Sequence, residues 1–514
     1  MDGGAPESNK MDEQLRRLYE RLGYMGPLPA DEPEPAAEDE SLASATQPQA
    51  PPPSEVAEEP TAIPQAVDDA EMPPIGFAGL DELERALNTR PEETLARARE
   101  AIDENISETE LRATIARARA ALDSPGTADS SLQAESAHFD SANPLPPDFD
   151  FEGIDLGEIP INPGDTKFET VADALGWAFL AGPFLLTQVF KADFRRHGDF
   201  ASRFAYELPE PGAGAPLEVA LFSDFGTGRY HSRYIAKQLR TRKFPFAFHL
   251  GDVYYAGRRS EFEQFFAAPL DPLLPDTTLF ALNSNHEMYS GGKPYFQFMD
   301  RRRAAHPATQ RQEGSYFSLS SSHFQIVGID TAYFKHGRHK EEKLLAWLTE
   351  TLRAGRDAGR VNILLSADHP YGYGHQGHSD LLDKDLAPLV KDEKLVDLWF
   401  WGNTHYCALF DRDDERPFIG SCIGHAGYPY DKQSQGKHSP APLRFLETAA
   451  RFPKATGVRQ DRGNNGYCVM TLRADGSVGL RYVDWMSRTR CEVELTRTAD
   501  ARLQIHEVVQ SQEE

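Results

Sequence analysis

Side chains that could bind metal ions follow one short apolar run after another in the second half of the sequence. Each run ends in a polar turn that carries a carboxylate, phenol, amide or imidazole group. The residues in question are Asp224, Asp252, Tyr255, Asn285, His286, Glu287, His369, Asn403 and His405. Any one of them is more often structural than catalytic, but the repetition at successive strand ends favours a metal site.

The donor set indicates which chemistry is available. Carboxylate, phenolate, amide and imidazole ligands together suit hard to borderline cations such as iron, manganese and zinc, and a set of this size predicts two ions. Hydrolysis of an anionic phosphate ester needs positive charge on the phosphate oxygens and a nucleophile formed near neutral pH. Two cations about 3.5 to 4 Å apart supply both, with metal-bound hydroxide attacking in line.

An α/β fold is required to bring these turns together. The apolar runs read "LEVALF", "FAFHL", "TLFAL", "FQIVGI", "VNILLS" and "DLWFW", and helical patterns such as "HSRYIAKQLRTR" and "KEEKLLAWLTETLRAG" lie between several of them. In a sheet of alternating strands and helices, the loops after the strand ends converge on one crevice. A hairpin turning at Asp475 and Gly476 is predicted to complete the second edge of the sheet.

The motifs "DFG", "GDVYY", "SNHE", "ADH" and "GNTH" carry a resemblance in their order and spacing. Over about residues 217 to 490 the sequence resembles the calcineurin-like metallophosphoesterase superfamily, whose pattern is DxH or DxG, GDxxY, GNH(D/E), a lone His and GHxH. Gly226 in place of a histidine, with Tyr255 three residues after Asp252, is similar to the purple acid phosphatase branch in particular. The resemblance implies a β-sandwich flanked by helices, which we place at residues 216–495.

The resemblance also implies a ligand set for two metal ions. The first ion would be held by Asp224, Tyr255 and His405, and the second by Asn285, His369 and Asn403. Asp252 would bridge the two ions.

A further group of residues is expected to meet the substrate. By the same resemblance His286 would lie just outside the metal ions, contact the phosphate and donate a proton to the leaving group. Asn285 is expected to contribute to substrate binding as well. Glu287 either orients His286 or is a plain outer carboxylate. His425, in "SCIGHAGYPY", either faces the site and binds substrate or is a turn histidine.

Three features depart from the family pattern, and one of them, Phe225–Gly226, matters only if Tyr255 points away from the site. Asn403 stands where the first His of GHxH is expected, and an amide oxygen binds transition metals more weakly than imidazole does. The second metal site is therefore expected to bind loosely, to prefer manganese or magnesium, or to be empty. Ser284 replaces the Gly of GNH(D/E), which predicts a minor change of turn geometry.

The N-terminal region has a different composition. Of the formal net charge of -26, 25 units fall within residues 1–160, which are rich in Pro, Glu and Ala. Such a composition predicts disorder, with a helical segment at about 79–123 that is either a docking element for a protein partner or simply solvent-exposed. Residues 161–215 are expected to form a helical lead-in, whose apolar run at 174–190 is either packed on the main domain or lies at a membrane surface. Residues 496–514 are expected to be a C-terminal tail.

Composition also limits compartment and partners. The four cysteines show no disulfide framework, and the N-terminus lacks the apolar core of a secretory signal, so a cytoplasmic location is predicted. No apolar run is long enough to predict a transmembrane segment. Because residues 161–514 are nearly neutral, long nucleic acid is not expected as a partner.

These observations predict a metal-dependent hydrolase. The expected substrate is a phosphate monoester or a small phosphodiester or nucleotide. The alternative is a pseudoenzyme, in which a weakened second metal site serves a binding or scaffolding module. Only Asn403 and Ser284 favour this alternative. The other ligand positions persist, although convergent carboxylates without a cation are costly to bury.

Overall fold

The structure is a computed structural model that describes most of the chain after residue 203. It covers residues 204–212, 214–332, 342–374, 379, 381–452, 460–500 and 502–511, together with 84, 85, 87–89, 91, 92 and 112. The described residues within 79–123 are helical. The other predictions for residues 1–203, including disorder over 1–160 and a helix at 174–190, lie outside the described residues.

The first of two β-sheets has eight strands. In spatial order they are β1 (Ala205–Glu207), β5 (Phe317–Ser320), β6 (Phe324–Ile329), β7 (Val361–Ser366), β8 (Leu398–Trp401), β10 (Ile419–Ile423), β9 (Cys407–Phe410) and β11 (Leu443–Leu446). Strands β6, β7 and β8 run parallel to one another, so their carboxyl ends lie at the same edge.

The second sheet has seven strands. In spatial order they are β15 (Leu503–Gln510), β14 (Thr489–Arg497), β13 (Val478–Asp484), β12 (Gly466–Leu472), β2 (Leu217–Phe222), β3 (Phe246–His249) and β4 (Thr278–Ala281). Strands β2, β3 and β4 are parallel, whereas β12 pairs antiparallel with β2.

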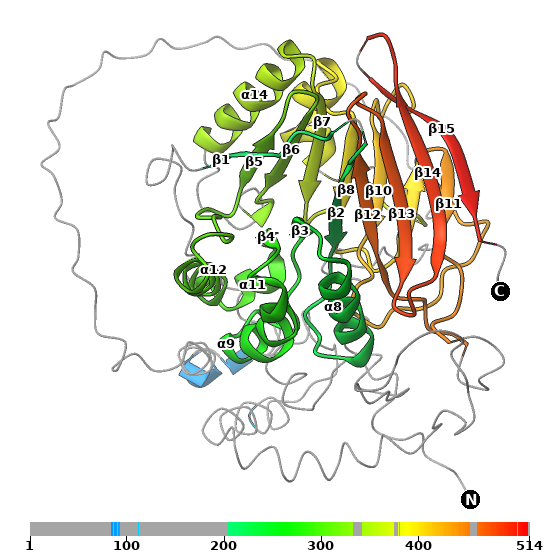
Figure 1. The fold of residues 1–514 in the computed structure, drawn as a ribbon. Coiled ribbons are helices and arrows are strands. Elements are labelled where there is room, and N and C mark those ends of the chain that lie inside the picture. The colour runs from blue at the N-terminus through cyan, green and yellow to red at the C-terminus, as the bar shows by residue number, and fades with distance from the viewer. Residues whose placement is uncertain are drawn as a thin grey trace, which may run out of the picture.

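The two sheets pack face to face as a β-sandwich (Figure 1). Their facing sides share one apolar core that includes Val219 and Leu221 of β2 and Met470 of β12. Because side chains alternate along a strand, Ala220 and Phe222 point to the outer face instead. The predicted sandwich is thus confirmed.

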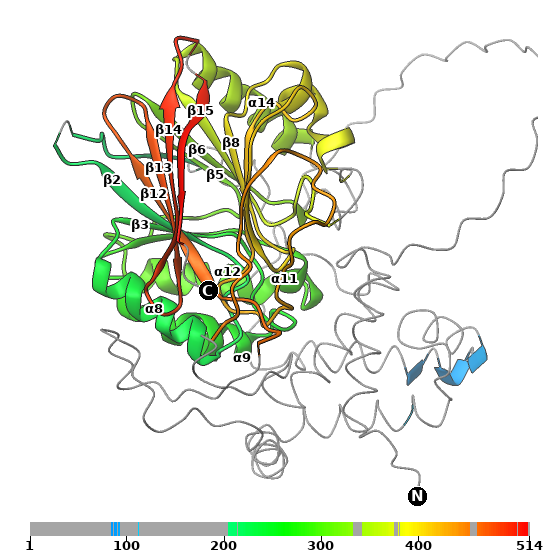
Figure 2. The same ribbon diagram turned by 90° about the vertical axis from the view of Figure 1, so that its right-hand side faces the viewer.

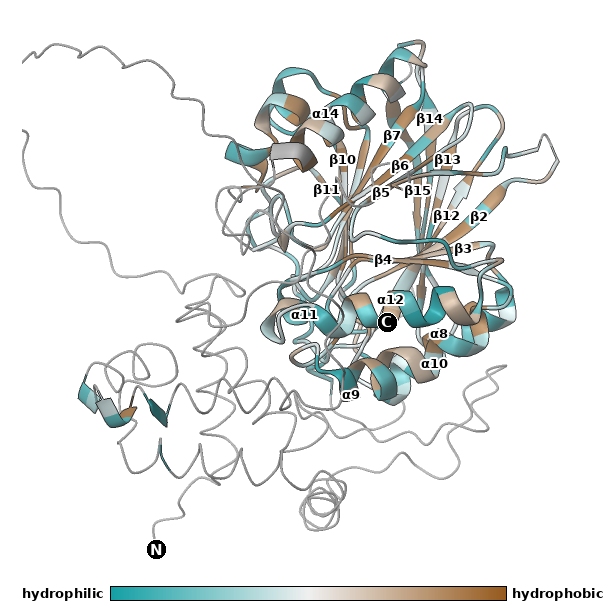
Figure 3. Cartoon of the chain, turned by 90° about the vertical axis from the view of Figure 1, so that its left-hand side faces the viewer, coloured by the Kyte–Doolittle hydropathy of each residue, from teal (hydrophilic) through white to brown (hydrophobic). Residues whose placement is uncertain are grey.

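Helices cover both outer faces of the sandwich (Figure 2). Helices α8 (Tyr230–Arg242) and α12 (Lys293–Ala305) lie against the second sheet together with a π-helix at Phe262–Ala267. Helix α14 (Glu342–Asp357) covers the first sheet. The strands are largely hydrophobic, while these helices carry hydrophilic residues as well (Figure 3). The helices predicted from "HSRYIAKQLRTR" and "KEEKLLAWLTETLRAG" are both present.

Shorter helical segments complete the described fold. They are α9 (Arg259–Glu261), α10 (Ala268–Leu270), a 3-10 helix at Asp271–Leu273, α11 (Asn285–Tyr289) and two π-helices at Leu381–Asp385 and Pro388–Asp392. Helix α11 follows β4 directly and belongs to the same edge of the sandwich as the carboxyl ends of the parallel strands. None of the helices in the described part of the chain has both the length and the apolar character that crossing a bilayer requires.

The edges of the domain differ from the predicted ones. Residues 205–207, expected in a helical lead-in, form the edge strand β1, and residues 503–510, expected in a tail, form the edge strand β15. The hairpin at Asp475 and Gly476 is confirmed as β12–β13, but β12 pairs with β2 and lies inside the sheet rather than at its edge. The sandwich therefore spans residues 205 to 510 instead of 216 to 495.

Candidate metal centre

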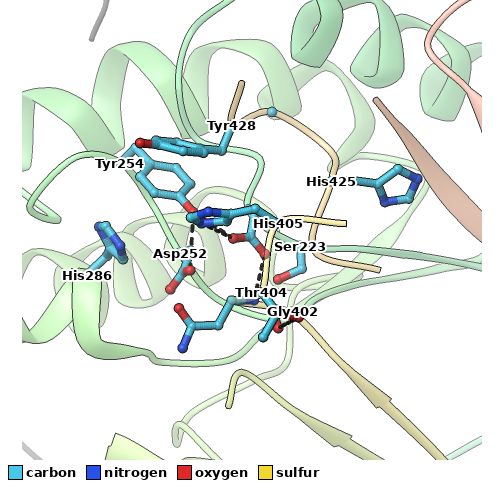
Figure 4. Close-up of polar contacts among 12 residues, drawn as sticks. Ser223, Asp252, Tyr254, His286, Gly402, Thr404, His405, His425 and Tyr428 are labelled. Atoms are coloured by element: carbon cyan, nitrogen blue, oxygen red, sulfur yellow. Dashed lines mark hydrogen bonds and ion pairs between the residues drawn. The ribbon is translucent and has the colours of Figure 1, made fainter. Parts of the chain in front are cut away.

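Three potential metal ligands meet at the carboxyl ends of the parallel strands. Asp224 follows β2, Asp252 follows β3 and His405 follows β8, and one ligand atom of each lies within 4.8 Å of the others. Both carboxylates are fully buried, and the imidazole is nearly so. Figure 4 shows Asp252 and His405 directed toward each other. The sequence prediction brought these three residues to one site, and the structure does the same.

The backbone at this cluster is strained. Asp224, Asp252, Asn403 and His405 have φ angles of 60°, 72°, 63° and 47°, in the left-handed region that residues other than glycine rarely occupy. Such conformations cost about 1 to 3 kcal/mol each and concentrate at functional sites, where the surrounding structure enforces them. Four of them in one cluster indicate that the side-chain positions are maintained at the expense of local stability.

A tyrosine hydroxyl lies between the three ligands. The hydroxyl oxygen of Tyr254 is 2.6 Å from Asp224 Oδ1, 3.3 Å from Asp252 Oδ2 and 2.8 Å from His405 Nε2. The sequence prediction gave this position to Tyr255, whose carbonyl oxygen instead accepts a hydrogen bond from His286 Nδ1 at 2.7 Å. The structure thus places the Tyr254 hydroxyl at this position, and the choice of tyrosine as metal ligand stays a prediction.

The buried carboxylates of Asp224 and Asp252 repel each other when both are ionised. Burial, together with the neighbouring charges of Asp224 and Glu287, raises the pKa of Asp252 well above its usual value. Burial also acts to raise the pKa of Asp224, but hydrogen bonds from His405, Tyr254 and the Asn403 backbone outweigh it and lower that pKa. A cation between the carboxylates would allow both to be ionised.

Ser284 and Glu287 fix the position of Asp252 from the other side. Ser284 caps helix α11, and its Oγ lies 2.5 Å from Asp252 Oδ1 and also contacts Glu287 Oε2. The Glu287 carboxylate accepts hydrogen bonds from the backbone of Val253 and Ser284, both at 3.0 Å. Glu287 is fully buried, and burial raises its pKa to about 7. It therefore supports the Asp252 loop, rather than orienting His286 as one prediction had it.

His286 and Asn285 lie at the start of α11. The His286 ring lies 4.4 Å from the Tyr254 ring, and the proton of its Nδ1 is directed to the Tyr255 carbonyl. Burial lowers the pKa of His286 to about 4, so the ring is neutral at pH 7 and its Nε2 carries a lone pair. Asn285 Nδ2 donates to Tyr289 at 2.9 Å.

The turn after β8 connects the cluster to the end of β7. The backbone N–H of Asn403 donates to Asp224 Oδ2 at 2.9 Å, and its side-chain Nδ2 donates to Asp368 Oδ1 at 3.1 Å. His369, the predicted ligand, follows Asp368 directly and is partly buried. Asp368 was missed by the sequence reasoning, although its place directly before a predicted ligand in "ADH" was a usable signal.

His425 lies away from the cluster. Its Nε2 is 3.0 Å from the position that a Cβ on Gly466 would occupy, and Figure 4 shows the ring set apart from Asp252 and His405. Burial lowers its pKa to about 4. This position does not support the predicted substrate contact, and His425 is instead a buried residue packed against β12.

Tyr428 is a further residue that the sequence reasoning missed. Its ring stacks on His405, with centroids 4.3 Å apart, and lies 4.7 Å from the ring of Tyr254. Its backbone N–H donates to the carbonyl of Asp224 at 2.9 Å. Tyr428, in the loop after β10, therefore packs against one side of the cluster.

Residues 217–407, which contain every member of the cluster, match the family model described as calcineurin-like phosphoesterase. The chain contains a calcineurin-like phosphoesterase domain. The matched stretch ends at β9, so the strands β10 to β15 complete the domain beyond it. No curated protein matches the sequence.

Several solved structures are similar to this chain in fold. GAP50, the anchor in the inner membrane complex of Plasmodium, is 16% identical with a TM-score of 0.41, over 57% of this chain and 90% of that one. The purple acid phosphatase PPD1 from yellow lupin (Lupinus luteus) seeds is 17% identical with a TM-score of 0.39, over 55% and 54%. A dimetal phosphatase from Danio rerio is 12% identical with a TM-score of 0.36, over 53% and 98%.

The calcineurin-like phosphoesterase domain implies bound metal ions, and the residues present fit at least one. Asp224, Asp252, His405 and the Tyr254 hydroxyl offer three kinds of donor within one buried cluster. Burial and the neighbouring carboxylates of Asp224 and Glu287 raise the pKa of Asp252, and a bound cation would oppose that effect. Asn285, His369 and Asn403 are the available residues on the side of β4, β7 and β8.

Proposed function

We propose that the chain is a metal-dependent phosphoesterase that hydrolyses a phosphate monoester or a small phosphodiester or nucleotide. The observation that carries this proposal is the convergence of Asp224, Asp252 and His405 at the strand ends of the calcineurin-like phosphoesterase domain. A phosphoesterase-type function follows from the domain, whereas the substrate class and a dinuclear site are part of the proposal.

The proposed ligand set divides into two groups. Asp224, His405 and the hydroxyl of Tyr254 would hold one ion, and Asp252 would be shared with a second. Asn285, His369 and Asn403 are proposed for the second ion. Oxygen donors joined by imidazole suit iron, manganese or zinc. Such ions supply positive charge to the phosphate oxygens and lower the pKa of water.

The chain's own residues would orient the substrate and move one proton. Because Nδ1 of His286 is bound to the Tyr255 carbonyl, Nε2 is the nitrogen left to meet a phosphate ester. Its proton donation to the leaving group needs the cationic ring, and an anionic phosphate next to the ring would raise the low pKa of the unliganded protein. Ser284 and Glu287 would hold Asp252 in place throughout.

The composition supports the remaining parts of the proposal. All four cysteines are free and buried, which is consistent with the reducing conditions of the cytoplasm. Residues 161–514 contain nearly equal numbers of acidic and basic side chains, which favours a small phosphorylated substrate over long nucleic acid. A protein partner for the acidic region 1–160 stays a prediction.

Metal content and turnover test this function together. The full chain is loaded with iron, manganese or zinc, analysed for bound metal, and assayed on an aryl phosphate monoester and its diester. Asp224→Asn should lower turnover at least 100-fold with loss of bound metal, whereas Asp300→Asn, at a partly exposed carboxylate on α12, should leave both unchanged. Absence of bound metal and of turnover under every loading condition would sink the proposal.

A further inference from the structure

Asn403 and Asp368 form a buried amide–carboxylate pair next to the proposed second metal site. The Asn403 side chain donates from Nδ2 to Asp368 Oδ1 at 3.1 Å, and the two residues are 3% and 4% exposed. They lie at the ends of the neighbouring parallel strands β8 and β7. Asn403 is the position at which this chain departs from the family pattern. Asp368 is a carboxylate to which that pattern assigns no role.

The carboxylate determines which end of the amide points away from it. An ionised carboxylate only accepts hydrogen bonds, whereas an amide has one donating end and one accepting end. With Nδ2 directed to Asp368, Oδ1 is the end that remains for other partners. The Asn403 backbone is fixed as well, by its hydrogen bond to Asp224 Oδ2 and by its left-handed φ of 63°. The backbone N–H and the side-chain Nδ2 of Asn403 are thus each held by a carboxylate, those of Asp224 and Asp368 respectively.

Asp368 is itself held rigidly. Its carbonyl accepts a hydrogen bond from Ser366 Oγ at 2.7 Å, and that hydroxyl accepts from the indole N–H of Trp399 at 2.8 Å. Its backbone N–H donates to Thr331 Oγ1 at 3.3 Å. The backbone of Asp368 is therefore fixed between β6, β7 and β8 by contacts that do not involve Asn403.

We propose that Asp368 is a positioning residue that makes Asn403 a competent metal ligand. Its carboxylate holds the amide with Oδ1 toward the second ion and polarises it, which partly compensates for the loss of an imidazole. Carboxylates that hold metal-binding histidines play the same part, and their removal costs about 10- to 100-fold in metal affinity. This inference rests on the proposed function, because it presumes two metal ions at this site.

Manganese binding to the full-length, metal-free chain tests the inference. The chain is titrated with Mn²⁺ by calorimetry, and the loaded protein is examined by electron paramagnetic resonance for the signal of two coupled Mn²⁺ ions. Asp368→Asn should weaken the second binding step about 10-fold or more and diminish the coupled signal, while the first step is retained. Retention of the first step also shows that the variant is folded, and Asp368→Ala provides a second test if the isosteric variant is unstable.

A second pair of variants asks whether Asp368 acts through Asn403. Asn403→Gly removes the amide at a φ that glycine accepts and should weaken the second step to a similar extent. Adding Asp368→Asn to Asn403→Gly should then change nothing further. A further loss in the double variant would show that Asp368 acts on the ion directly, and would overturn the positioning role.

The remaining outcomes separate this inference from the proposed function. Asp330→Asn is the matched control, because Asp330 is a buried carboxylate at the end of β6 that accepts from Asn283 rather than from Asn403. Two Mn²⁺ ions bound equally well by the parent and by Asp368→Asn would overturn the inference alone. Binding of a single ion by the parent would also overturn it, since Asn403 would then not be a ligand. Failure of the parent to bind Mn²⁺, iron or zinc would overturn the proposed function itself.

Discussion

Two adjacent tyrosines follow β3, and their hydroxyl groups are not equivalent. The hydroxyl of Tyr254 lies within 3.3 Å of all three ligands of the cluster, whereas Tyr255 contributes its carbonyl oxygen to His286. If the first metal is ferric iron, its phenolate ligand should therefore be Tyr254. The adjacent pair allows each residue to serve as the control for the other.

The iron-loaded protein should absorb visible light because Tyr254 binds the iron as a phenolate. We expect a visible phenolate-to-iron absorption band in the parent, its loss in Tyr254→Phe and its retention in Tyr255→Phe, measured by absorption spectroscopy at equal iron content. Loss of the band in Tyr255→Phe alone would instead support the ligand that the sequence pattern favoured. An active protein without iron or colour would indicate manganese or zinc in this site.

His249 should make stability depend on pH. The residue is 1% exposed, its ring lies 4.6 Å from that of Phe266, and burial lowers its pKa to about 3. The unfolded state, with an ordinary pKa near 6.5, binds this proton more readily than the folded state does. The contribution of His249 to the free energy of unfolding is therefore full above about pH 6.5. It falls by about 1.4 kcal/mol per pH unit as the pH drops from 6.5 toward 3.

Replacing this histidine should reduce the pH dependence. In the metal-free protein, His249→Met should take up one proton fewer on unfolding, measured as a shallower change in the free energy of unfolding between pH 6.5 and 4. His438→Gln, at an exposed histidine, is the control and should match the parent. An unchanged slope in His249→Met would show that His249 is not held neutral.

The site could be predicted from sequence as far as residue types and strand ends determine it. Asp224, Asp252 and His405 each follow a buried strand, so the topology alone brings them together. The direction of a side chain beyond the strand is not determined in this way, because the regular alternation ends where the backbone turns. For this reason the family pattern named Tyr255, and neither Tyr254 nor Tyr428 was predicted to lie at the cluster.

At the scale of elements, helix α11 is the device that joins β4 to the cluster. Its N-cap, Ser284, accepts from the backbone of Asp252 and His286 at 3.1 and 3.2 Å while its hydroxyl contacts two carboxylates. The expected minor change of turn geometry at Ser284 thus understates its part. The residue stabilises the helix start and separates Asp252 from Glu287.

Removal of this hydroxyl should destabilise the protein. Ser284→Ala removes a helix cap and the hydroxyl donor to Asp252 Oδ1, whereas Glu287 Oε2 keeps the backbone N–H of residue 284. The change should cost about 1 to 3 kcal/mol. The measurement is urea unfolding of the metal-free protein, with the midpoint lowered and the slope unchanged. Ser434→Ala, at an exposed serine, should have no effect. A parent-like midpoint in Ser284→Ala would show that the hydroxyl contacts contribute nothing net.

The interior strands and the long helices were predictable because their apolar patterns are continuous. Strands β2, β6, β7 and β8 are buried along almost their whole length, and α14 carries a regular apolar stripe toward the sheet. The edge strands β1 and β15 were missed, since most of their residues are exposed or only partly buried. Edge strands are determined by backbone pairing more than by side-chain burial, and pairing leaves a weak pattern in sequence.

At the scale of the whole molecule, the sandwich depends on residues beyond the family match. Strand β12 pairs with β2 along five residues, from Leu217 to Leu221, and its Cys468 and Met470 enter the core between the sheets. Removal of residues 466–514 would expose β2 and remove the buried side chains of β12 to β15 from that core. The family match at 217–407 therefore does not delimit a folded unit.

Truncation should have different effects on folding at the two ends of the chain. A chain that ends at residue 465 should lose cooperative thermal unfolding and near-ultraviolet circular dichroism. A chain that lacks residues 1–160 should keep both, because every strand of the two described sheets begins after residue 204. Cooperative unfolding of the chain that ends at residue 465 would show that β2 is stable without β12.

The pairing of β2 with β12 also determines when the second sheet can form during synthesis. During synthesis the strand that leads to Asp224 leaves the ribosome long before the strand that must lie beside it. The nascent chain therefore carries an apolar strand with one unpaired edge, open to wrong pairing or aggregation, until the last hairpins have emerged. The buried carboxylates of Asp224 and Asp252 are brought to their final positions only at that point, so we expect metal to be acquired after these hairpins have emerged.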